Sequence, residues 1–325
     1  MNTSPRHSGV LCTALLTILT PAASAETYPV RPIRFINPTA PGGTAEPIAR
    51  VIALKLSESL GQSVVVDSRG GAGGTVATAM AANALPDGYT LLLGVVSPMA
   101  INVSLYGAKL PYDPLRDFAP ITLITRVPQV LSVRPAVPAT TIKQLIALAK
   151  DPNAKLNYGS AGSGTTGHLV GELFKKRAGI QLTHVPFKGS GPALSAFLSG
   201  DVAIMYSGPP AVLALAQAGR LHVLATSGVT RTPVLPDVPT FIESGLPIDV
   251  TSWYCLVVPA RTPQAIVTRL HAATVAALNS PPVADTLLKM GAPPEPSSPE
   301  ELRNFLRLEI RKFAEVVAIA GAQID

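Results

Sequence analysis

The sequence predicts an α/β protein of two lobes, each an open and mostly parallel sheet flanked by helices. Strand, glycine-rich loop and helix follow one another repeatedly, an order typical of parallel sheets with ligand loops at the carboxyl ends of their strands. The unit occurs in both halves of the chain. The chain of 325 residues is also longer than a domain with one hydrophobic core usually is, which favours two lobes.

The N-terminus has the composition of a secretory signal peptide. A short basic region with Arg6 precedes an apolar segment over 10–19, and Ala23-Ser24-Ala25 follows. This pattern predicts cleavage before Glu26. The apolar segment is too short to span a bilayer. We therefore expect residues 1–25 to be removed and the mature protein to lie outside the cytoplasm.

Three strand-loop pairs are expected in the first half. A strand over 33–36 leads into the loop 37–47, where Pro47 places the helix start at about Ala45 or Glu46. A strand over 64–66 leads into the glycine-rich loop 67–75. A third strand, over 89–93, ends in a loop that contains Ser97.

The second half contains the clearest candidate binding loop. A strand over 155–158 runs into the segment Gly159–Gly167, which is rich in glycine and hydroxyl residues, and an amphipathic helix ends at Gly179. Backbone N–H groups and the helix dipole at such a start favour a phosphate or carboxylate. A strand over 181–186 then breaks into a second loop that contains Lys188.

Charge and cysteine content exclude several classes of function. The net charge of +6 is spread along the chain without a basic block, so nucleic acid is not an expected partner. After cleavage only Cys255 remains, in an apolar strand, and we expect a buried thiol. The histidines lack metal-ligand spacing, so neither a metal nor another cofactor is predicted.

The motifs, taken in order, resemble the Bug, or TctC-like, family of periplasmic solute-binding receptors of tripartite tricarboxylate transporters. The resemblance covers essentially the whole mature chain. It is carried by Ala40-Pro41-Gly42-Gly43-Thr44-Ala45-Glu46, Gly70-Gly71-Ala72-Gly73-Gly74-Thr75, Pro86-Asp87-Gly88-Tyr89, Tyr158-Gly159-Ser160-Ala161-Gly162, His184-Val185-Pro186-Phe187-Lys188-Gly189 and Pro236-Asp237-Val238-Pro239.

The resemblance implies a periplasmic-binding-protein fold with a ligand cleft between the lobes. Residues 26–125 and 250–325 would form the first lobe and 126–249 the second, with chain crossings near 121–133 and 250–258. It implies a monomeric, non-catalytic receptor in the periplasm. Its expected partners are a small organic carboxylate (a di- or tricarboxylate, an aromatic acid or an amino acid) and integral-membrane transporter subunits.

Family members hold a ligand carboxylate mainly through backbone amides and ordered water. Residues in the matching loops and at neighbouring strand ends are therefore the candidate binding residues. They are Pro41, Gly42, Gly43, Thr44, Glu46, Ser97, Ser160, Ala161, Gly162, Thr165, His168, Lys188 and Ser207.

Two departures from the family pattern affect the expected ligand. Glu46 stands where most members have aspartate, and Ser207 stands where an aspartate often follows the strand. Loss of that second carboxylate removes a partner for a ligand ammonium, which favours a simple carboxylate over an amino acid.

Two other functions are compatible with parts of the sequence. Gly162–Gly167 matches the G-x-G-x-x-G pattern of dinucleotide-binding oxidoreductases, but the next strand ends at Phe187-Lys188 without the acidic residue that binds ribose. An extracytoplasmic sensor would need the same closing cleft as a transport receptor. Arg69 is expected to pair locally, and Tyr206 and Trp253 to pack in the core or near the hinge.

Overall fold

The computed structural model describes residues 1–2, 28–151 and 153–323, so the predicted signal peptide lies outside the described residues apart from Met1 and Asn2. The strands are β1 (Ile33–Asn37), β2 (Val64–Ser68), β3 (Thr90–Val95), β4 (Phe118–Pro128), β5 (Val130–Val133), β6 (Asn157–Ser160), β7 (Thr183–Pro186), β8 (Ile204–Ser207), β9 (His222–Thr226) and β10 (Thr251–Pro259). The α-helices are α1 (Ala45–Leu60), α2 (Thr75–Ala82), α3 (Asn102–Tyr106), α4 (Ile142–Ala149), α5 (Thr166–Ala178), α6 (Ser190–Ser199), α7 (Pro209–Gln217), α8 (Gln264–Asn279), α9 (Pro281–Lys289) and α10 (Pro299–Ala320). Short helical turns η1 (Ala72–Gly74), η2 (Ser97–Ile101) and η3 (Gly107–Lys109) complete the first half. None of the helices in the described ranges is long and apolar enough to cross a bilayer.

The strands form two five-stranded sheets, in the orders β2-β1-β3-β10-β4 and β7-β6-β8-β5-β9. In the first sheet β1 is parallel to β2 and β3, whereas β10 is antiparallel to β3 and β4. In the second sheet β6 is parallel to β7 and β8, whereas β5 is antiparallel to β8 and β9. The two predicted sheets are confirmed, but both are mixed rather than mostly parallel, because one reversed strand in each makes half of the strand pairings antiparallel.

The reversed strands are those that follow a passage of the chain between the sheets. Strand β4 belongs to the first sheet and β5, one residue later, to the second, while β9 belongs to the second sheet and β10 to the first. Two neighbouring parallel strands need a crossover connection, usually a helix. The β4-β5 and β9-β10 connections are not crossovers of this kind, because each leads from one sheet to the other. Gln129 is the single residue between β4 and β5.

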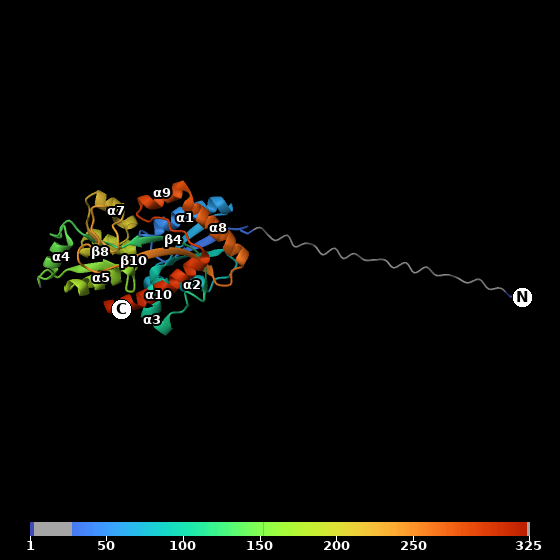
Figure 1. Ribbon diagram of the computed structural model, residues 1–325, viewed down its shortest axis with the longest axis horizontal. Helices are drawn as coiled ribbons and strands as arrows, with labels where there is room; N and C mark the ends of the chain where they lie inside the picture. Colours follow the sequence, from blue (N-terminus) through green and yellow to red (C-terminus); the bar gives the residue numbers. More distant parts are fainter. Residues whose placement is uncertain (3–27, 152, 324–325) are drawn as a thin grey trace.

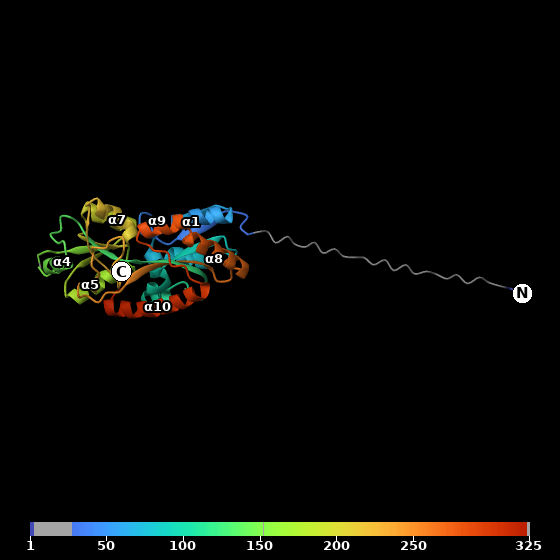
Figure 2. The same cartoon turned by 45° about the horizontal axis from the view of Figure 1, so that its top comes forward.

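The two sheets lie side by side along the long axis of the molecule. Helices α4, α5 and α7 surround the second sheet, and α1, α8, α9 and α10 surround the first (Figure 1). In the turned view α1 and α9 lie on one side of the first sheet and α10 on the other (Figure 2). This arrangement gives two lobes joined by the β4-β5 connection and the approach to β10.

The last helix connects the lobes as well as packing on one of them. A capping box between Ser298 and Glu301 starts α10, and Leu302, Leu306 and Phe313 are buried as the sequence stripe predicts. The helix contacts β4, α3 and α5. Lys176 of α5 also donates to the carbonyl of Ile319 at 2.8 Å. The C-terminal helix therefore touches the second lobe through α5.

The buried positions predicted for Trp253 and Cys255 on β10 are confirmed. Trp253 is fully buried against Phe305, and its indole N–H donates to Glu309 Oε2 at 2.7 Å. Cys255 is also fully buried, and burial raises the pKa of its thiol. Strand β10 thus supplies core side chains on both of its faces, and Cys255 has no features of a nucleophile.

Candidate functional site

A cavity of about 460 Å³ lies between the two lobes. Its walls come from the loops at the carboxyl ends of the parallel strands in both sheets and from the two strands that join the lobes. This volume is in the usual range for small-molecule sites. The residues that line it include Pro38, Thr39, Ala40, Thr44, Gly70, Gly71, Gly73, Gly74, Ser97, Gln129, Ala161, Gly162, Ser163, Thr165, Thr166, Gly167, Phe187, Lys188, Ser190, Tyr206, Ser207, Gly208, Ser252 and Tyr254.

The second-lobe wall is the start of α5. The loop that leads to it turns through Gly162 and Gly164, at φ values of +127° and +74° that a glycine adopts without strain. Thr165 caps no backbone group with its side chain, because its hydroxyl donates instead to the carbonyl of Gly162 at 2.7 Å. First-turn N–H groups have no partner within a helix, and Thr166 and Gly167, which carry two of them, line the cavity. These amides and the helix dipole make a site for an anion.

Ser160 and His168 were predicted at the ligand, but neither lines the cavity. The Ser160 hydroxyl lies 2.7 Å from His184 Nε2, and His168 stacks on His184 with ring centroids 4.2 Å apart. His168 Nδ1 also accepts the N–H of Gly164 at 3.2 Å. Both side chains therefore lie behind the loop and fix its shape, because apolar and aromatic packing at α5 turns them inward.

Pro41, Gly42, Gly43 and Glu46 also lie outside the lining. The N–H of Gly42 donates to Glu46 Oε2 at 2.7 Å, and Arg50 binds the other carboxylate oxygen. This N–H and the Arg50 guanidinium hold the pKa of Glu46 below its usual value. Gly42 was predicted as an amide donor to the ligand, but in this structure its N–H is already bonded to Glu46. Glu46 stabilises the loop from inside the first lobe.

Replacing Glu46 with Gln should change the acid dependence of folding. A lowered pKa in the folded state means that the carboxylate stabilises the protein above the unfolded value of about 4.3, and that this contribution disappears as pH falls through the folded pKa. We expect Glu46→Gln to cost about 1 kcal/mol at pH 7, the net value of a typical hydrogen bond, and much less near pH 3. Urea unfolding of both proteins at the two pH values checks this. An equal cost at both values would contradict the assigned role.

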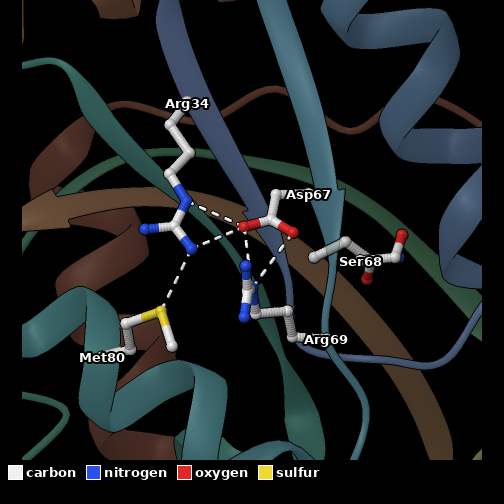
Figure 3. A network of polar contacts seen from close by, with 6 residues as sticks. Arg34, Asp67, Ser68, Arg69 and Met80 are labelled. Atoms are coloured by element: carbon white, nitrogen blue, oxygen red, sulfur yellow. Dashed lines mark hydrogen bonds and ion pairs between the residues drawn. The ribbon is translucent and has the colours of Figure 1, made fainter.

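Lys188 is the one charged residue among those described as lining the cavity. It follows β7, and no carboxylate in the described part of the chain pairs with it. Arg69, beside the glycine-rich loop of the first lobe, is engaged elsewhere. Its Nε contacts both oxygens of Asp67, which Arg34 also binds (Figure 3). The local pairing predicted for Arg69 is confirmed, and the lining carries one positive charge without a negative one.

The lobes touch at the rim of the cavity. The N–H of Gly208 donates to Thr44 Oγ1 at 3.2 Å, across the cavity from one lobe to the other. A Cβ on Gly43 would lie 2.6 Å from Ser190 Cβ, and one on Gly191 would lie 2.1 Å from the carbonyl oxygen of Pro41. The loop after β1 and the start of α6 are therefore in contact, which explains why Pro41, Gly42 and Gly43 lie at the rim. The structure has the lobes closed on each other.

Of the predicted residues, those that line the cavity are Thr44, Ser97, Ala161, Gly162, Thr165, Lys188 and Ser207. Ser207 Oγ is buried and makes no hydrogen bond to the described residues. Thr166 and Gly167 also line the cavity; they belong to the predicted binding loop but were not among the individual candidate residues. The lining residues that the sequence did not indicate include Gln129, Ser252 and Tyr254, which come from the region that joins the lobes and carry no glycine motif. Pairing of β4 with β10 brings those strands together, and no local pattern reveals it.

Comparison with known proteins identifies the family. Residues 48–321 match the profile described as "Tripartite tricarboxylate transporter family receptor". The chain belongs to this family. It is 39% identical to the protein BugT of Bordetella pertussis over 303 residues, which are 93% of each chain. The resemblance found in the motifs is therefore confirmed, and the family is one of solute-binding receptors.

Solved structures of similar proteins share the two-lobed fold. A protein described as a periplasmic transporter is 38% identical with a TM-score of 0.88, covering 92% of this chain and all of that one. An R. palustris protein solved with adipate is 37% identical, with a TM-score of 0.88 and the same coverage. MatC from Rhodopseudomonas palustris, with bound malate, is 34% identical with a TM-score of 0.84 and covers 89% of this chain and all of that one. The fold is the two-lobed type of periplasmic binding proteins.

Proposed function

We propose that this protein is a non-catalytic periplasmic receptor that encloses a small dicarboxylate between its lobes and delivers it to a membrane transporter. One observation carries the proposal: an interlobe cavity lined by helix-start amides, hydroxyls and a single ammonium group, with no acidic side chain among its described lining residues. Such a lining favours an anion that must leave again, because amides bind a carboxylate without the strength of a buried arginine pair.

The departure of this chain from the family pattern at Ser207 favours a dicarboxylate over an amino acid as the ligand. Ser207 occupies the cavity wall where related sequences often have an aspartate, and no other described lining residue provides a carboxylate for a ligand ammonium. The relatives solved with adipate and malate bind dicarboxylates of six and four carbons. We assign the ligand carboxylates of this chain to the amides of Thr166 and Gly167 and to the ammonium of Lys188.

Delivery to membrane subunits rests on the family, and passage to the periplasm rests on the predicted signal peptide. The candidate lobe boundaries, 26–125 with 250–325 and 126–249, place Gln129 and the approach to β10 at the hinge. Closure around the ligand would present a joined surface of both lobes to the transporter.

Thermal unfolding of the mature protein with a panel of ligands tests the proposal. The panel contains mono-, di- and tricarboxylates, aromatic acids, amino acids and nicotinamide dinucleotides. A ligand at a hundredfold its Kd adds about 2.7 kcal/mol of stability, enough for a clear shift in melting temperature. We expect the largest shift from a dicarboxylate. A shift with a dinucleotide alone would contradict the proposal.

A further inference from the structure

A hydrogen-bond chain connects the hinge to the ligand wall. Gln129 Nε2 donates to Ser252 Oγ at 2.9 Å, and Ser252 Oγ donates to Thr166 Oγ1 at 3.1 Å. The three residues lie on different elements: Gln129 between β4 and β5, Ser252 on β10, and Thr166 at the first position of α5. All three are at least nine-tenths buried and line the cavity.

The direction of this chain follows from the chemistry of its first donor. An amide nitrogen can only donate, so Ser252 accepts from Gln129 and has one hydrogen left to give. The acceptor within its reach among the described residues is Thr166 Oγ1. Thr166 therefore uses a lone pair for Ser252, and its own hydrogen is directed elsewhere. Among the described residues no acceptor is bonded to this hydrogen, and Thr166 lines the cavity.

The backbone of Gln129 is held firmly enough to maintain this direction. Its N–H donates to Ser227 Oγ at 2.8 Å, and its carbonyl accepts the N–H of Ser227, also at 2.8 Å. Ser227 Oγ in turn donates to the carbonyl of Val250, just before β10. The donor at the start of the chain is thus fixed by both connections between the lobes.

We infer that Thr166 is a specificity-determining residue whose hydroxyl is held as a hydrogen-bond donor to a ligand carboxylate, and that Gln129 and Ser252 are positioning residues that set this polarity. The inference rests on the proposed function and deepens it. A hydroxyl fixed as a donor, next to the helix-start amides of Thr166 and Gly167, donates to a carboxylate oxygen, while Ser252 occupies one of its two lone pairs. The preference for a carboxylate then follows from the hinge as well as from the loop motif.

The test measures the affinity of four variants for malate and adipate by isothermal titration. Thr166→Val removes the hydroxyl at nearly constant volume and should raise Kd about tenfold to a hundredfold, the effect of losing a hydrogen bond to a charged group. Thr166→Ser keeps the hydroxyl and should bind within about twofold of the wild type, since the donor remains. Ser252→Ala removes the donor that fixes the direction of the Thr166 hydroxyl, and it should raise Kd about threefold to tenfold. Ser252→Thr keeps a hydroxyl at this position and should not raise Kd.

The double variant separates a positioning role from a structural one. In the Thr166→Val background, Ser252→Ala should have almost no further effect on Kd, because Ser252 acts through the missing hydroxyl. Thermal unfolding without ligand verifies that each variant is folded. If Thr166→Val left the affinity unchanged, or if Ser252→Ala changed Kd equally in both backgrounds, the inference would be overturned but the proposed function would not. A wild-type protein that binds no dicarboxylate would overturn the proposed function and the inference with it.

Discussion

Replacing Gly191 with Val is expected to abolish ligand binding while leaving the protein folded. A Cβ at this position would lie 2.1 Å from the carbonyl oxygen of Pro41, which belongs to the opposite lobe. That distance is far inside van der Waals contact, and the obstructing atom is backbone, so the lobes must separate. Within α6 itself valine is a better helix former than glycine, and the second lobe should tolerate it. We expect no measurable binding in titration and no ligand-induced decrease in the radius of gyration.

Ser195 provides the matched control for this variant. It lies on the same helix and is exposed, so Ser195→Val adds the same side chain without reaching the other lobe. This control should bind as the wild type does and close in the same way in X-ray scattering. If Gly191→Val also bound normally, the contact between the loop after β1 and the start of α6 would have no part in enclosing the ligand.

Replacing Lys188 with Met should weaken dicarboxylate binding about fivefold, because Lys188 is exposed and an ion pair at an exposed position contributes at most about 1 kcal/mol. Methionine keeps a long apolar side chain and removes the charge. The wild-type affinity should also decrease with added salt, and that dependence should be smaller in the variant. Titration at low and high ionic strength measures both effects.

Arg69→Met is the control for the loss of one positive charge near the cavity. The Arg69 guanidinium is bound to Asp67, whose carboxylate it shares with Arg34 (Figure 3). Its removal should leave Kd within about twofold, since this exposed guanidinium is already paired with Asp67 and its field is screened by salt. Equal losses in the two variants would indicate a general effect of net charge, and the assignment of Lys188 to the ligand would then be wrong.

The repeated strand, loop and helix units made the two sheets predictable from sequence. Pro47 located the start of α1, which begins at Ala45, and the glycine-rich loop located the wall at α5. The direction of the reversed strands β5 and β10 was harder to predict from sequence, because it depends on how the chain passes between the lobes and not on a local pattern. The buried positions of Trp253 and Cys255 followed from the apolar character of β10.

The candidate loops could be located from the sequence because anion sites occur at helix starts. The candidate residues that do not line the cavity include some with an alternative partner nearby. The N–H of Gly42 is used by Glu46, and the Ser160 hydroxyl contacts His184, and neither competing bond can be recognised from spacing alone. Gln129 and Ser252 were missed because they join the cavity only when β4 pairs with β10.

The most direct test of the account is a crystal structure of the mature protein with the tightest-binding dicarboxylate of the panel. We expect the ligand inside the interlobe cavity, with one carboxylate within hydrogen-bond distance of the N–H groups of Thr166 and Gly167 and of the Thr166 hydroxyl. We expect the Lys188 ammonium to contact a ligand carboxylate as well. A ligand bound outside the cavity, or held by neither the start of α5 nor Lys188, would contradict the account.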